Sequence, residues 1–93
     1  MRKYEMLYIL STKLSDEERD AIVAKFENVV ASNNGKVEVV DKWGVKKLAY
    51  PINYETEGYY VLMSFESDVN LIAELKRVAG ITNGILRRLI TRA

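Results

Sequence analysis

Residues 2–18 read R-K-Y-E-M-L-Y-I-L-S-T-K-L-S-D-E-E, and the periodicity of this stretch changes halfway. Residues 2–10 alternate between two faces, as in a strand. One face collects Tyr4, Met6, Tyr8 and Leu10. Ser15 and Glu18 then have the spacing of a capping box, in which each residue satisfies a free backbone amide of the other. The stretch therefore predicts a strand followed by a helix that begins after Ser15.

Working outward, this first helix is expected to stop at Asn33-Asn34-Gly35, where a left-handed residue can end it. A second strand is expected over 36–42. It continues through 48–52 with a bulge or twist at Gly44. Pro51 has no amide to donate to a ladder, which indicates that this strand lies at an edge of its sheet.

The second half of the chain repeats the order of strand and helix. Residues 53–58 are expected to form a turn, and residues 59–66 the third strand. Ser67 or Asp68 is predicted to cap a second helix that Gly80 ends. Asn83-Gly84 is a turn signal, and the last strand is expected over 85–92.

The resulting order is βαββαβ within one domain, residues 1–93. Right-handed crossovers place both helices on one face of a four-stranded antiparallel sheet. The predicted fold class is therefore α+β, a ferredoxin-like split βαβ sandwich. Its first and third strands are central, and its second and fourth strands are edges.

The other face of this sheet has no layer in the chain to cover it. We assign Tyr4, Met6, Tyr8, Leu10, Val61, Met63 and Phe65 to the helix side. The outward side then carries Leu7, Ile9, Tyr60 and Leu62 on the two central strands. Such a patch is typical of a protein interface. The last strand mixes apolar and basic residues on both faces, so the sequence leaves its orientation open.

Composition excludes several functions. The chain has no histidine and no cysteine, which removes the commonest general base, the thiol nucleophile and the usual zinc ligands. We therefore expect no catalytic residue, no metal and no cofactor. Neither a signal peptide nor a transmembrane segment is evident, so we expect a cytoplasmic protein without a membrane partner. The net charge is only +1, yet the basic residues are clustered.

Residues 43–52 read W-G-V-K-K-L-A-Y-P-I and place two adjacent lysines among aromatic rings. Cations suit phosphates and flat rings suit bases. This motif, the N-terminal M-R-K-Y-E, the G-Y-Y at 58–60 and the R-R at 87–88 resemble the bacterial small-subunit ribosomal protein six family. The resemblance runs in order along the whole chain. Many family members carry a charged C-terminal extension, whereas this sequence ends at Ala93, so the resemblance does not extend to contacts that such a tail makes in relatives.

The resemblance implies a non-enzymatic constituent of the ribosome. It implies binding to small-subunit ribosomal RNA of the central domain together with small-subunit ribosomal protein eighteen, without a small-molecule substrate. We expect phosphate contacts from Arg2, Lys3, Lys46, Lys47, Arg87, Arg88 and Arg92. We expect contact with the protein partner from Leu7, Ile9, Trp43, Tyr60 and Leu62.

Three alternatives share this architecture. An RNA recognition motif would bind single-stranded RNA through exposed aromatic residues of its first and third strands, and it requires Tyr8 to face solvent. An acylphosphatase-type enzyme needs an anion-binding loop with an arginine, whereas residues 11–14 read S-T-K-L. A homodimer could instead bury the outward face of the sheet against a second copy.

Overall fold

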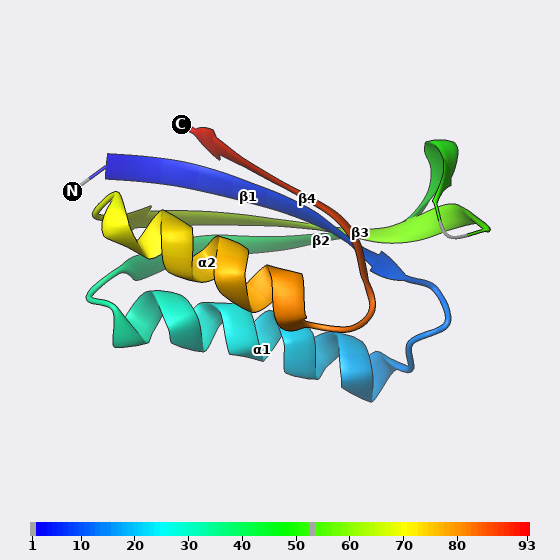
Figure 1. Cartoon of the computed structure of the whole chain (residues 1–93), viewed down its shortest axis with the longest axis horizontal. Coiled ribbons are helices and arrows are strands. Elements are labelled where there is room, and N and C mark those ends of the chain that lie inside the picture. The colour runs from blue at the N-terminus through cyan, green and yellow to red at the C-terminus, as the bar shows by residue number, and fades with distance from the viewer. Residues whose placement is uncertain (1, 53) are drawn as a thin grey trace.

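The computed structural model describes residues 2–52 and 54–93 and has the predicted order of elements. The elements are β1 (Arg2–Ser11), α1 (Asp16–Ser32), β2 (Lys36–Ile52), β3 (Glu55–Ser67), α2 (Asn70–Ile81) and β4 (Ile85–Arg92). The strands form one antiparallel sheet in the order β2-β3-β1-β4. Both helices lie on the same face of that sheet (Figure 1). The ferredoxin-like sandwich is confirmed, with β2 and its Pro51 at an edge.

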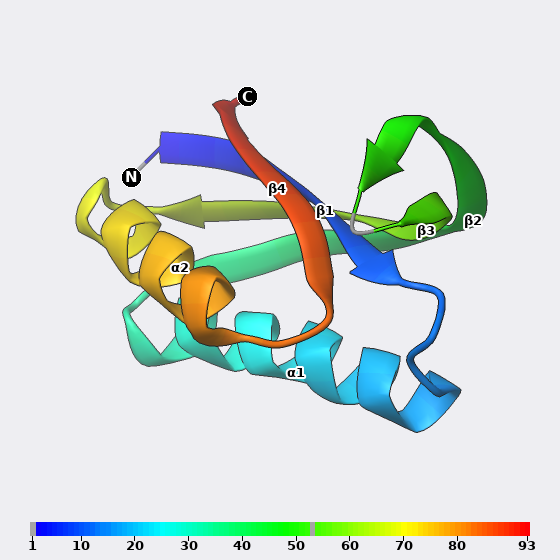
Figure 2. The same ribbon diagram turned by 45° about the vertical axis from the view of Figure 1, so that its right-hand side comes forward.

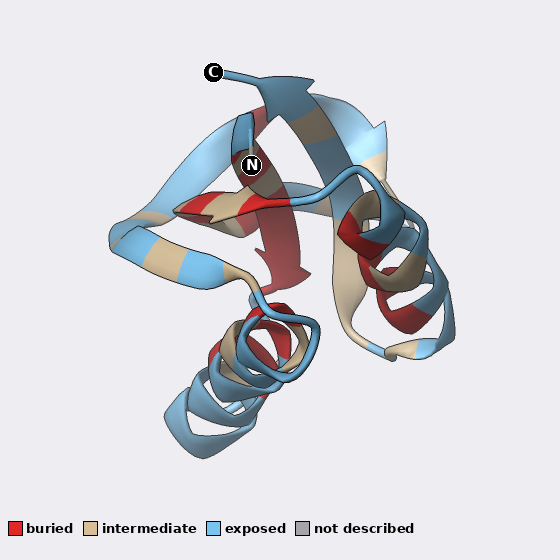
Figure 3. Cartoon of the chain, turned by 90° about the vertical axis from the view of Figure 1, so that its left-hand side faces the viewer, coloured by how far each residue is buried: buried red, intermediate tan, exposed pale blue. Residues whose placement is uncertain are grey.

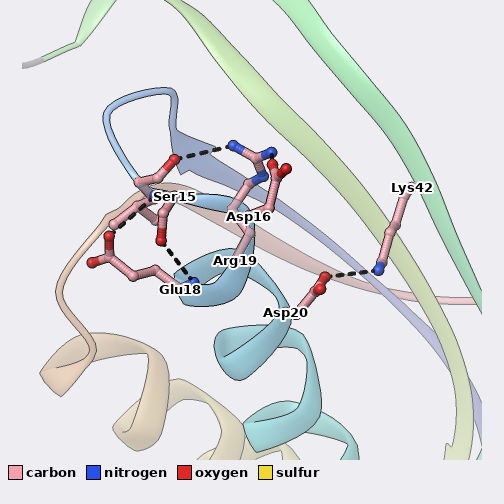
Figure 4. Close-up of polar contacts among 7 residues, drawn as sticks. Ser15, Asp16, Glu18, Arg19, Asp20 and Lys42 are labelled. Atoms are coloured by element: carbon pink, nitrogen blue, oxygen red, sulfur yellow. Dashed lines mark hydrogen bonds and ion pairs between the residues drawn. The ribbon is translucent and has the colours of Figure 1, made fainter.

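Helix α1 begins and ends as predicted. The Ser15 hydroxyl accepts a hydrogen bond from the Glu18 amide at 3.2 Å, and the Glu18 carboxylate accepts one from the Ser15 amide at 3.1 Å (Figure 4). At the other end Asn34 is left-handed, with φ of 63°. Lys42 forms an ion pair with Asp20 at 3.1 Å, which ties β2 to the first half of the helix (Figure 4).

The predicted boundaries of α2 are wrong at both ends. Ser67 is buried at the end of β3, and its hydroxyl donates to the Asp68 carbonyl, so neither residue caps the helix with its side chain. The helix also continues through Gly80 to Ile81. There the Thr82 hydroxyl donates to the Val78 carbonyl at 2.6 Å, which satisfies a terminal acceptor without a glycine.

The turn predicted over 53–58 is also too long. Strand β3 already begins at Glu55, which pairs with Ile52, and Glu57 pairs with Lys47. Asn53 lies outside the described residues. Residues 55–57 are polar because this part of the hairpin extends beyond the core, so they lack the alternation by which a strand is recognised.

The core lies between the sheet and the helices. All seven residues expected on the helix side belong to one buried cluster with apolar residues of both helices. Figure 3 marks the buried stretches of the strands and of both helices in red. Tyr8 packs edge-on against Phe26 of α1, with ring centroids 4.9 Å apart. Neither described helix combines the length and the apolar character that a membrane crossing requires.

The register settles the orientation of β4. Leu89 pairs with Leu7 and Arg87 with Ile9, so these two β4 residues are on the face opposite the helices. The register shifts between Ile9 and Leu10, and Ile85 consequently packs against the core. Ile85 therefore faces the helices, whereas Arg87 and Leu89 face away from them. Neither orientation applies to the whole of β4.

Candidate functional site

The second half of β2 bends over the open face of the sheet (Figure 2). The register of β2 against β3 shifts at Lys42/Gly44, and Gly44 takes a φ of 86° that favours glycine. Beyond this bulge β2 reaches back toward the opposite edge strand. The Tyr50 ring consequently lies 5.6 Å from the Arg87 guanidinium of β4.

The bend creates an apolar groove of about 230 Å³ on the open face. Its floor comes from the central strands, and its walls come from β2 and β4. The lining residues are Leu7, Ile9, Leu48, Ala49, Tyr50, Ile52, Tyr60, Arg87, Arg88 and Leu89. Leu89 is 56% exposed, although it lies among apolar neighbours. A concave apolar surface of this kind suits the side chains of a protein partner.

Five of these lining residues were missed by the sequence analysis: Leu48, Ala49, Tyr50, Ile52 and Leu89. Leu48 is only 6% exposed and Ile9, which lies beside it near Gly58, is only 8% exposed. Little of the Ile9 surface therefore remains for a partner. The apolar alternation of the 48–52 segment was the available signal, but the bend that turns it toward the sheet is not local.

The remaining residues expected to contact the partner lie at or beside the groove. Tyr60 lines it, and the Trp43 ring stacks on Tyr60 with centroids 6.4 Å apart and planes 10° from parallel. Leu62 pairs with Leu7 in the sheet but is not part of the lining. The groove, together with Trp43, therefore forms one continuous apolar and aromatic surface, which we call the open-face groove.

Cations stand on both sides of the open-face groove. The Lys46 ammonium lies 4.7 Å from the Trp43 ring centroid, a cation–π contact. Arg87 pairs with Ile9 and lines the groove from the open face of β4. Arg88 also borders the groove, but it pairs with Tyr8, so its side chain starts from the helix-facing side of β4. Lys47 follows Lys46 directly along β2, where successive side chains alternate between the two faces.

Ion pairs within the part of the chain that the structure describes involve Lys3, Arg19, Lys42 and Arg77. Lys46, Lys47, Arg87 and Arg88 take part in none of them. Their charge is available to a ligand.

The other three predicted phosphate contacts lie at the opposite end of the sheet. Arg2 pairs with Ser67 and Arg92 with Tyr4, while Lys3 forms an ion pair with Glu38 at 3.8 Å. Ile9 is six positions after Lys3 along β1, which is a distance of about 20 Å. The seven basic residues therefore make two groups and not one continuous patch.

Tyr8 does not have the exposure that the RNA recognition motif alternative requires. Its side chain is fully buried, and its hydroxyl has no hydrogen-bond partner among residues 2–52 and 54–93. Burial, with a smaller contribution from the negative charge of Glu27, raises the pKa of this phenol. A base cannot stack on Tyr8 in this fold.

The side chains at the open-face groove are apolar, aromatic and basic. In the described ranges, no three acidic side chains come together where they could hold a metal ion. What the site offers is apolar surface, stacked rings and four free cations. These groups recognise macromolecules through shape, apolar cover and phosphate charge.

Comparisons with known proteins agree with this geometry. The family described as ribosomal protein S6 matches residues 3–92. The small ribosomal subunit protein bS6 of Thermoanaerobacter pseudethanolicus is 51% identical over 92 residues, which cover 99% of this chain and 97% of that protein. The bS6 protein of Clostridium novyi is 47% identical over 90 residues, covering 97% and 95%.

Solved structures show the same architecture. The crystal structure of 30S ribosomal protein S6 from Thermotoga maritima superposes with a TM-score of 0.94 at 29% identity, covering 99% of this chain and 87% of that one. The C-terminal domain of the MgtC protein from Mycobacterium tuberculosis has a TM-score of 0.68 at 8% identity, covering 100% and 88%. The second likeness concerns the fold alone.

Proposed function

This chain belongs to the ribosomal protein S6 family of the small ribosomal subunit, and on that premise we propose that it binds ribosomal RNA of the central domain jointly with small-subunit protein eighteen. In this proposal the protein is a structural constituent of the cytoplasmic ribosome and has no catalytic role. The observation that carries the proposal is the open-face groove with Lys46, Lys47, Arg87 and Arg88 at its margins, none of which has an ion-pair partner among residues 2–52 and 54–93.

The two kinds of group suit two kinds of partner. An apolar groove gains free energy when another protein covers it, whereas RNA offers few apolar side-chain-sized groups to fill it. Lysine and arginine without carboxylate partners suit phosphates, and arginine can bind a phosphate through two hydrogen bonds. We therefore assign the groove to protein eighteen and the flanking Lys46, Lys47, Arg87 and Arg88 to the RNA backbone.

Joint binding follows from the charge of the chain. A net charge of +1 provides little long-range attraction to RNA, so the protein alone should bind weakly. When protein eighteen is already bound to the groove, the second binding event becomes intramolecular, and the affinity of the pair exceeds that of either protein. Arg2, Lys3 and Arg92 can serve only RNA that extends to the far end of the sheet.

The electrostatic half of the proposal is tested by titrating a central-domain RNA transcript at several salt concentrations in the presence of protein eighteen. Four phosphate contacts give a slope of log affinity against log salt of about −3 to −4, since each contact contributes roughly 0.7 to 0.9. Arg87→Ala and Lys46→Ala should each reduce the magnitude of the slope by about one contact. Lys42→Ala is the matched control, because Lys42 is already paired with Asp20. A slope near zero contradicts this assignment.

The protein half is tested with Leu89→Asp. The substitution places a carboxylate in the groove at an exposed position, so it should abolish the gain in RNA affinity that protein eighteen provides without unfolding the chain. Circular dichroism checks the fold. If protein eighteen improves RNA binding by the wild type and by this variant equally, the groove is not its binding site.

A further inference from the structure

Tyr54 occupies a backbone conformation that tyrosine disfavours. It lies in the connection of the β2–β3 hairpin, next to the pair formed by Ile52 and Glu55, and its φ is 65°. A side chain with a Cβ atom is destabilised in this left-handed region, which is why two-residue hairpin turns favour glycine where φ is positive. The other described left-handed residues are Asn34, Gly44 and Gly84, all of types that tolerate this conformation.

The tyrosine ring makes no contact within the described part of the protein that would offset the strain of this conformation. Its side chain is fully exposed, so it buries no apolar surface within the chain. A glycine at the same position would relieve the strain. Where strain at an exposed residue has no compensating contact inside the molecule, a contact outside it is the physical reason to look for.

The hairpin is fixed where it leaves the body of the protein. The Glu55 carboxylate accepts hydrogen bonds from the Ser11 hydroxyl at 2.8 and 2.9 Å and from the Thr12 amide at 3.2 Å. These bonds join the residue after Tyr54 to the loop that follows β1. The hairpin itself projects beyond the helices (Figures 1 and 2). The backbone next to Tyr54 is therefore already fixed, so a binding partner needs to order little of the backbone at this position.

The surroundings of Tyr54 favour a nucleobase over a protein partner. Tyr54 is not among the residues that line the open-face groove. Its side chain therefore lacks the surrounding apolar residues that a hot spot of a protein interface has. Lys46 and Lys47, which have no ion pair within the described chain, lie on the same arm of β2. Free cations along a strand with an exposed ring at its end are the combination that binds a single-stranded segment.

We propose that Tyr54 stacks on an unpaired base of the RNA that the Lys46–Lys47 arm holds by its phosphates. This inference rests on the proposed RNA-binding function and adds to it a specific aromatic contact outside the groove. A tyrosine face stacks on any base, so the contact would strengthen binding and position the RNA without reading its sequence.

The test compares Tyr54→Gly with Tyr54→Phe, using the central-domain transcript with protein eighteen. Tyr54→Gly should raise the Tm by a few degrees, because the strain is relieved, and should weaken RNA binding by about 5- to 100-fold, because the stacking ring is lost. Tyr54→Phe should bind RNA as the wild type does. A ring with a purely structural role would instead make Tyr54→Gly less stable and leave its RNA affinity unchanged.

Wild-type RNA affinity in Tyr54→Gly overturns the inference, whatever its Tm. If Lys46→Ala still reduces the salt slope in that case, the RNA-binding function stands and only the stacking contact is wrong. If Tyr54→Gly weakens binding to isolated protein eighteen in the absence of RNA, the ring contacts the protein, and the nucleobase assignment is refuted.

Discussion

Tyr8 carries a buried hydroxyl that the fold does not satisfy, and Tyr8→Phe removes it. The ring is fully buried against Phe26, and the phenol oxygen has no hydrogen-bond partner within the described residues. A buried polar group without a partner costs about 1–3 kcal/mol of stability. Phenylalanine keeps the ring and its packing, so we expect the variant to be more stable by about 1 kcal/mol at neutral pH.

The gain should grow at alkaline pH, and its sign follows from the raised pKa of the phenol. In the unfolded chain Tyr8 ionises near pH 10, whereas in the folded chain burial keeps it protonated. The unfolded state then binds fewer protons than the folded state, so stability is fully present below about pH 10 and falls as the pH rises above it. One such group accounts for a loss of about 1.4 kcal/mol between pH 9 and pH 11. Tyr8→Phe lacks this loss, so its advantage should increase to about 2.4 kcal/mol at pH 11.

Urea unfolding followed by circular dichroism at pH 8, 9, 10 and 11 measures both effects. Tyr54→Phe is the matched control, because Tyr54 is fully exposed and keeps its backbone conformation in the variant. Its stability should follow that of the wild type at every pH. A Tyr8→Phe variant that is less stable than the wild type, or whose advantage is the same at pH 8 and pH 11, would show that the hydroxyl is satisfied in solution and that the reasoning is wrong.

Two further predictions concern the scaffold. A Cβ added at Gly58 would lie 2.3 Å from the Ile9 Cγ2 atom, so Gly58→Ala should lower the stability of the fold by about 1–3 kcal/mol. A Cβ added at Gly80 in α2 meets nothing within 4 Å, so Gly80→Ala should raise the stability by about 0.5–1 kcal/mol. Thermal unfolding measures both, and equal shifts in Tm for the two variants would contradict this reasoning. Ser15→Ala removes the cap of α1 and should lower stability by about 1 kcal/mol in urea unfolding, and an unchanged midpoint would mean that Glu18 and solvent replace the cap.

Local signals in the sequence were reliable where the structure depends on neighbours in the chain. The capping box at Ser15 and the left-handed residue after α1 involve contacts within a few positions, and both are present. The failures at α2 show the limit of such signals. Ser67 has a favourable residue type for a cap, but its burial at the end of β3 decides its hydrogen bond, and Thr82 substitutes for a glycine terminator.

The candidate site was less predictable than the fold. The residue types were visible in the motif at 43–52, and its Lys46, Trp43 and Tyr50 lie at the open-face groove. Their grouping was not visible, because the seven basic residues separate into two sets about 20 Å apart along the sheet. A sequence pattern counts charges, whereas strand register decides which of them can reach the same ligand.

By itself, the sequence determined the type and order of the elements, the helix-facing side of the central strands and the edge position of the strand with Pro51. These properties follow from the two- and 3.6-residue periods and from the missing amide of proline, all of which act within one segment. The bulge at Gly44 was also predicted and is confirmed. Only the tertiary structure decided that the segment beyond it bends over the open face, that Leu48 lies beside Ile9, and that Tyr50 meets Arg87 across the sheet. The physical reason is that these contacts join residues far apart in the chain, and their geometry depends on pairing and bulges that no single segment specifies.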